Sequence, residues 1–130
     1  MRLIREFMAA LQLLLEGKDL EHRREELKKL YEQYIGPYEL YHNATIDVAM
    51  RALASYDEGQ RLERMEMLAE LYYAEADTVT GPDRNFLLDK AFNLFAFIER
   101  NGKTFSMDRR YKMGLIEQRL KKCSGKTRCE

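Results

Sequence analysis

LERMEMLAELYYAEADTVTGPDRNFLLDKAFNLFAFI, the stretch from Leu62 to Ile98, decides the fold because its apolar residues are dense enough to form the centre of a core. In its first half, apolar residues recur at steps of three and four, which is the spacing of one helix face. In its second half they occupy most sides of a helix, as in a helix that is covered almost all round. The sequence therefore predicts two central helices joined at Gly81-Pro82.

Residues with capping chemistry mark the ends of both central helices. Asp57 and Gln60 have the spacing of a capping box, which would satisfy two free N–H groups at the start of the first helix. Pro82 suits the first position of the second helix, and Asn101-Gly102 suits its C-terminal cap.

Apolar stripes predict three further helices before the central pair and one after it. Gly17 ends the first, and Gly36-Pro37 separates the second from the third, because proline lacks an N–H and restricts the residue before it. Asp19 and Ser106 are the expected caps of the second helix and of the last. The expected ranges are about Leu3–Glu16, Leu20–Ile35, Pro37–Ser55 and Met107–Lys122. Short connections favour antiparallel neighbours, so we expect an all-α antiparallel bundle of five or six helices.

Length and composition indicate one soluble domain. The chain has 130 residues, of which 45% are apolar and 34% charged, and its few glycines and prolines make strands and hairpins unlikely to form. Apolar periodicity ends near Lys122. We therefore expect a single helical domain over residues 1–122 and a basic, mobile tail over residues 123–130.

Several features favour a cytoplasmic protein. No apolar run approaches the roughly 20 residues that span a bilayer. Glu6 and Gln12 interrupt the apolar N-terminal segment and no small-residue cleavage site follows, so we interpret it as an amphipathic helix of the mature protein. Cys123 and Cys129 both lie in the tail, where a disulfide would staple nothing in the core.

The zero formal charge conceals a division of charge along the chain. Residues 1–102 contain 13 Lys and Arg against 19 Asp and Glu, a net charge of −6, whereas residues 103–130 contain 9 against 3, a net charge of +6. The basic end is therefore predicted to act electrostatically, either against the acidic body or against an acidic partner. The candidate residues are Arg109, Arg110, Lys112, Arg119, Lys121 and Lys122.

Tyrosine is the unusual feature of the composition, since seven of the eight tyrosines lie between Tyr31 and Tyr73. A tyrosine side chain combines apolar area with a polar tip, so it serves both at the boundary of a core and at a protein interface. Both interpretations stay open from sequence. The candidate partner-binding residues are Tyr31, Tyr34, Tyr38, Tyr41 and Tyr73.

The sequence contains no recognisable catalytic, metal or cofactor motif. Asp19-x-x-His22 and Glu39-x-x-His42 imitate the carboxylate–histidine pairs of di-metal bundles, but both lie in first helical turns, where acidic residues suit the helix dipole. The Cys123–Cys129 spacing matches no standard zinc pattern and favours free thiols. We therefore expect no catalytic residues, no metal and no cofactor.

Small and aromatic positions in the central stretch resemble those of a tetratricopeptide hairpin. They are Leu68-Ala69, Tyr72, Ala91-Phe92, Phe95 and Ile98. The match covers one hairpin, with no second copy at a period of about 34 residues. Residues 61–108 are also similar to a family of small bacterial helical proteins of unknown function. These resemblances imply tetratricopeptide-like helix packing and supply no functional residues.

The leading hypothesis is a non-enzymatic helical module for protein–protein interaction, which binds a protein partner or itself through a tyrosine-lined face. The alternative is a binder of nucleic acid or of another anionic surface through the basic C-terminal helix and tail. No membrane partner is expected.

Overall fold

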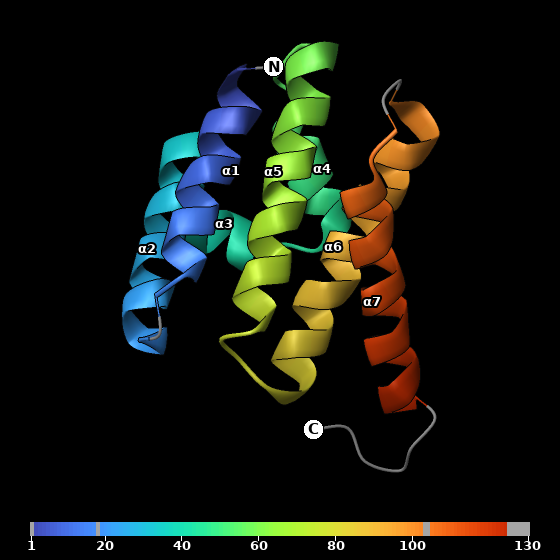
Figure 1. The fold of residues 1–130 in the computed structure, drawn as a ribbon. Helices are drawn as coiled ribbons and strands as arrows, with labels where there is room; N and C mark the ends of the chain where they lie inside the picture. The colour runs from blue at the N-terminus through green and yellow to red at the C-terminus, as the bar shows by residue number, and fades with distance from the viewer. Residues whose placement is uncertain (1, 18, 103–104, 125–130) are drawn as a thin grey trace.

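A computed structural model describes residues 2–17, 19–102 and 105–124 of the chain, and the side chains of residues 3–17, 19–102 and 105–121. Within these residues it contains seven α-helices and no strand (Figure 1). The predicted all-helical class is therefore confirmed. The helices are α1 (Arg2–Leu15), α2 (Leu20–Tyr34), α3 (Tyr38–Asn43), α4 (Ile46–Leu53), α5 (Glu58–Ala76), α6 (Gly81–Asn101) and α7 (Met107–Ser124).

Helices α5 and α6 form the antiparallel hairpin at the centre of the fold. α5 packs against α1, α2 and α4 as well as against α6, while α7 covers the far side of α6 (Figure 1). The hairpin turns at Gly81, whose φ of +62° lies in the left-handed region that favours glycine, and Pro82 follows in the first turn of α6. The two predicted central helices are thus confirmed. Their fully buried apolar side chains include Met65, Leu68, Ala69, Leu71, Tyr72, Leu88, Ala91, Leu94 and Phe95.

Phe95 provides a test of how central α6 is to the core. Its side chain is fully buried. We expect Phe95→Ala to lower the free energy of unfolding by about 3–5 kcal/mol, because the substitution removes buried apolar area and leaves a cavity. Chemical denaturation of both proteins measures the difference. A loss below about 1 kcal/mol would mean that the site collapses around the smaller side chain.

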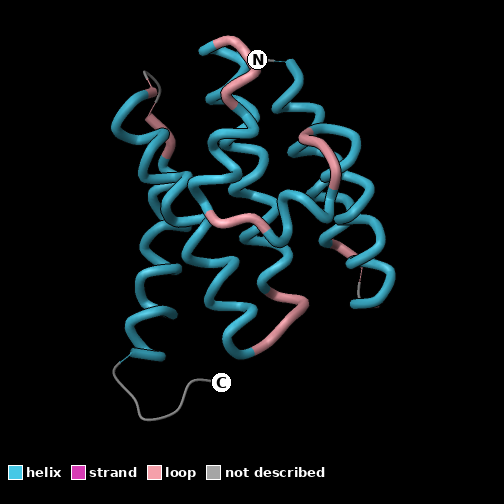
Figure 2. Tube along the Cα trace, turned by 180° about the vertical axis from the view of Figure 1, so that it is seen from behind, coloured by secondary structure: helices cyan, strands magenta, loops and turns pink. Residues whose placement is uncertain are grey.

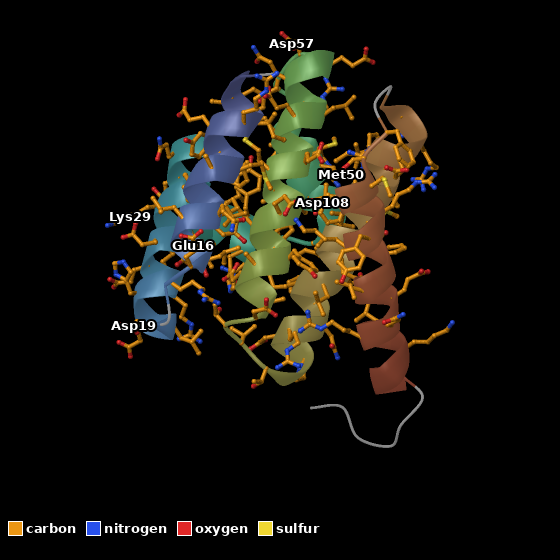
Figure 3. The ribbon with its side chains drawn as sticks, viewed as in Figure 1. Glu16, Asp19, Lys29, Met50, Asp57 and Asp108 are labelled. Carbon is orange, nitrogen blue, oxygen red and sulfur yellow. The ribbon has the colours of Figure 1, made fainter. Side chains whose placement is uncertain are left out.

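Capping residues define where several helices begin, as the sequence predicts. The Asp19 carboxylate accepts from the N–H groups of Glu21 and His22. The Asp57 carboxylate accepts from Gln60 at the start of α5, and the Ser106 hydroxyl accepts from Arg109 at the start of α7. Figure 3 shows Asp19 and Asp57 at opposite ends of the molecule.

The structure corrects the predicted single helix over Pro37–Ser55, which is two helices, α3 and α4. The break falls at Ala44, whose backbone is extended, and Thr45 then caps α4 by accepting from Val48. The carbonyls of Tyr41, His42 and Ala44 accept hydrogen bonds from the Lys90 ammonium, and the Tyr41 carbonyl also accepts from Tyr72. A continuous helix would use these carbonyls in its own ladder. Figure 2 shows the resulting connection from behind.

The C-terminal boundary also differs from the prediction. Helix α7 continues to Ser124, two residues into the segment predicted as a tail. Residues 125–130, with Cys129, lie outside the described residues, as does the side chain of Cys123. Among the described helices, none combines the length and apolarity needed to cross a membrane.

Candidate functional site

The structure places the five candidate tyrosines at different depths. Tyr31, Tyr34 and Tyr41 are buried, whereas Tyr38 and Tyr73 are partly exposed. Of the two interpretations that the sequence left open, burial favours a core position for Tyr31, Tyr34 and Tyr41, whose rings fill space between helices. Tyr34, for example, packs edge-on against Phe7 and donates to the Glu6 carboxylate. Only Tyr38 and Tyr73 offer part of their rings to solvent.

Two of these tyrosines converge on a buried carboxylate, that of Glu75 on α5. The hydroxyl of Tyr31, from α2, donates to Glu75 Oε1 at 2.6 Å, and the hydroxyl of Tyr38, from α3, donates to Oε2 at 2.6 Å. His42 Nδ1 lies 2.8 Å from the same Oε2. Glu75 is only 4% exposed, so these three partners take the place of water around its charge. The cluster ties α2 and α3 to α5.

The surroundings of Glu75 keep both phenols protonated. Burial raises the pKa of Tyr31 well above its usual value, and the neighbouring Glu75 charge raises that pKa further. The same two causes, burial and then Glu75, raise the pKa of Tyr38. Both hydroxyls therefore stay hydrogen-bond donors throughout the physiological pH range.

A pocket of about 180 Å³ opens above this cluster. Its walls come from α2, α3, α5 and the loop between α5 and α6, and its lining residues are Arg24, Lys28, Tyr38, His42, Glu75 and Val79. Arg24 is anchored by a hydrogen bond of 3.1 Å to the Thr78 carbonyl. The Lys28 ammonium lies 5.3 Å from the centre of the Tyr38 ring. We call this the Glu75 pocket.

A shallower hollow of about 560 Å³ adjoins the pocket along α2 and α3. Lys28 and Tyr38 line both spaces, so the two lie next to each other. Figure 3 shows Lys29 on the outer side of α2, pointing into solvent. The lining residues of this α2–α3 groove are Lys28, Lys29, Glu32, Gln33, Tyr38 and Glu39. The groove carries charges of both signs and has a positive end at the pocket.

Lys90 anchors the junction between α3 and α4. It is 1% exposed, and its ammonium donates to the Tyr41, His42 and Ala44 carbonyls at 2.8–3.3 Å. The ammonium also lies 4.2 Å from the ring centres of Tyr72 and Phe86. Burial lowers the pKa of Lys90 to about 8, although the Glu75 charge opposes that shift. The side chain holds the α3–α4 junction, and with it His42, against α6.

Cations of the basic end pair with the acidic body. Arg109 is 1% exposed and bonds to Glu66 at 3.1 Å and to Glu99 at 2.6 Å. Arg110 reaches Glu99 at 3.0 Å, Lys112 reaches Glu70 at 2.6 Å, and Arg119 reaches Asp77 at 3.3 Å. Lys121 is exposed, and the side chain of Lys122 lies outside the described residues. Four of the six candidate cations therefore pair with carboxylates of residues 1–102.

These ion pairs differ in how much they should stabilise the fold. Arg109→Met should lower the free energy of unfolding by about 2–3 kcal/mol, because Glu66 and Glu99 would lose a buried partner but are exposed enough to recover water. Arg119→Met should cost less than about 1 kcal/mol, since that pair is exposed. Denaturation at low and high salt measures both. Equal losses for the two variants would contradict this ranking.

Sequence reasoning missed Glu75, Lys90 and the interior role of His42. A signal for the first two exists: Glu75 follows Tyr72 by three residues, and Lys90 follows Leu87 by three and precedes Leu94 by four. Each charge therefore shares a helix face with core residues. His42 carried no such signal, because its partner Glu75 is 33 positions away and the break at Ala44 was not predicted.

Comparisons with known protein families, with curated proteins and with solved structures give no significant match. The geometry of the site is therefore the basis for assigning a function. Within the described part of the chain, no group of three or more His, Cys, Asp or Glu side chains is arranged to hold a metal ion.

Proposed function

We propose that this protein is a non-enzymatic helical interaction module, with hairpins of the tetratricopeptide type, which binds a segment of a partner protein in the α2–α3 groove. The observation that carries the proposal is that the groove and the Glu75 pocket lie side by side and share Lys28 and Tyr38. Together they provide a hollow of about 560 Å³ beside a smaller pocket of about 180 Å³, which suits a segment that lies along α2 and α3 and anchors one side chain in the pocket.

The polar cluster supports a binding role rather than a catalytic one. Both oxygens of Glu75 and the Nδ1 atom of His42 are engaged with one another and with two phenols that stay protonated. Such an arrangement orients side chains and joins helices. It ties together the three helices that form the Glu75 pocket, and a preorganised pocket loses less entropy when a partner binds.

The alternative of nucleic-acid binding through the basic helix receives less support from the geometry. Arg109, Lys112 and Arg119 would have to leave carboxylates of the body before neutralising phosphates. A partner in the α2–α3 groove displaces no ion pair of α7.

A peptide array of 12-residue segments with systematically varied charge tests this function. We expect wild-type protein to select a subset of peptides, Lys28→Glu to lose most of that binding, and Lys121→Glu to keep it. Both substitutions reverse one exposed charge, and Lys121 lies on α7, away from the groove. If the array shows no selection, or if Lys121→Glu rather than Lys28→Glu abolishes it, the groove is not the binding site. Loss of selection with Lys121→Glu alone would favour an interaction of the basic end instead.

A further inference from the structure

The two cations of the Glu75 pocket differ from the cations of α7 that pair with carboxylates of the body. Lys29, Lys112 and Arg119 each have a carboxylate partner. Within the described residues, the Lys28 ammonium instead contacts only the face of Tyr38, and Arg24 bonds only to the carbonyl of Thr78. Arg24 and Lys28 are four residues apart on one face of α2, so both charges reach the same space. Arg24 and Lys28 therefore form no ion pair within the described residues, although the Glu75 carboxylate lines the same pocket.

His42, from α3, also lines the Glu75 pocket. Its Nδ1 atom faces Glu75, and its ring stacks on Tyr38 with centres 4.9 Å apart. Since Nδ1 is engaged and the side chain is 31% exposed, Nε2 is the ring atom left for a ligand. A protonated ring would donate from Nε2 while Nδ1 still donates to Glu75. The Glu75 carboxylate is held by hydrogen bonds from Tyr31 and Tyr38 and by the contact with His42 Nδ1, so its oxygens are already engaged when a ligand enters.

We propose that the Glu75 pocket binds the phosphate of a phosphorylated side chain. A phosphomonoester carries close to two negative charges and three terminal oxygens, whereas a carboxylate carries one charge and two oxygens. Arg24 and Lys28, both from α2, supply two positive charges and several N–H donors to the phosphate, and His42 from α3 presents its ring edge to the same space. The planar fork of Arg24 can bind two phosphate oxygens at once, and Lys28 supplies a point charge to the third.

This inference rests on the proposed function and specifies the partner that the groove would accept. Because Lys28 and Tyr38 border both spaces, a phosphorylated residue in the pocket would leave the flanking residues of its segment along α2 and α3. The pocket would then supply specificity for the phosphate, and the groove would supply the remaining contact area. The partner is a protein segment modified on a hydroxyl side chain.

The test uses three blocked pentapeptides that differ only at the central residue: phosphoserine, serine or glutamate between alanines. Titration into isotope-labelled full-length protein, followed by NMR, should show the phosphopeptide binding at least tenfold more tightly than the glutamate peptide. The shifted resonances should map to α2 and α3. Inorganic phosphate should perturb the same resonances more weakly, since it makes no groove contacts.

Substitutions separate the pocket from general charge. Lys28→Gln and Arg24→Gln should each weaken phosphopeptide binding about tenfold, whereas Lys121→Gln, which removes one exposed charge elsewhere, should leave it unchanged. Arg24 and Lys28 are exposed, so both variants should stay folded. Equal binding of the phosphoserine and glutamate peptides, or equal losses for all three variants, would overturn the phosphate assignment. Selection in the peptide array with no preference for phosphate would overturn this inference alone, and failure of both experiments would remove the proposed function as well.

Discussion

Glu75→Ala should lower the free energy of unfolding by about 4–6 kcal/mol. The substitution removes the acceptor of two phenols and of His42, and hydrogen bonds to a charged group are each worth roughly 1.5–3 kcal/mol. The expected total is near the lower end of that sum, because His42 is exposed enough to bond to water instead. Such a loss is comparable with the whole stability of many domains, about 5–15 kcal/mol. Denaturant titration followed by circular dichroism measures it.

Two further proteins distinguish the hydrogen-bond explanation from a general effect of altering α5. Glu70→Ala removes another buried carboxylate of the same helix, which pairs with the ammonium of Lys112, and should cost about 1–3 kcal/mol. Tyr31→Phe combined with Glu75→Leu removes donor and acceptor together, so it should cost less than Glu75→Ala. A loss within about 1 kcal/mol of zero for Glu75→Ala would show that water replaces the carboxylate.

The sequence predicts features that depend on residues close together in the chain and misses those that depend on residues far apart. Helix class, the Gly81-Pro82 turn and the caps at Asp19 and Asp57 depend on residues within one or two turns, so a local pattern is sufficient. The break at Ala44 depends on Lys90, which lies 46 positions further along the chain. A local pattern does not contain that contact, and the apolar stripe runs through the break.

For the candidate site too, the sequence indicated local features and missed contacts between distant residues. Tyrosine clustering singled out Tyr38, which lines both the pocket and the groove. It could not separate Tyr31, which is buried against Glu75, from Tyr38, since the two have the same composition signal and differ only in tertiary position. Charge division likewise predicted an electrostatic role for the basic end, and the carboxylates that Arg109 contacts became visible only in the fold.

Alkaline pH should unfold the protein in one steep transition above about pH 10. Burial is the largest cause of a raised pKa at six tyrosines. These are Tyr31, Tyr34, Tyr38, Tyr41, Tyr72 and Tyr73. Above the ordinary tyrosine value of 10.0, the unfolded chain loses these protons while the folded chain retains them. The unfolded state then binds fewer protons, so stability falls as pH rises.

The lowered pKa of Lys90 makes stability rise with pH, but the effect of the six tyrosines is larger. Its pKa is about 8 in the fold and 10.5 in a free lysine, so between these values the unfolded chain binds the extra proton and stability rises with pH. One group changes stability by at most about 1.4 kcal/mol per pH unit, whereas six tyrosines acting together can change it by up to about 8 kcal/mol per pH unit. We therefore expect a small gain in stability between about pH 8 and 10, followed by a rapid loss.

Denaturant titrations at a series of pH values, with tyrosinate absorbance recorded beside helical circular dichroism, measure this transition. The two signals should change together, because the buried phenols ionise when the chain unfolds. Tyr111→Phe alters a ring that is 67% exposed on α7 and should leave the transition in place. Tyr72→Phe removes one raised pKa and should reduce the steepness of the loss by about 1.4 kcal/mol per pH unit. Gradual ionisation of all eight tyrosines around pH 10 with full helicity retained would contradict the burial on which the Glu75 cluster depends.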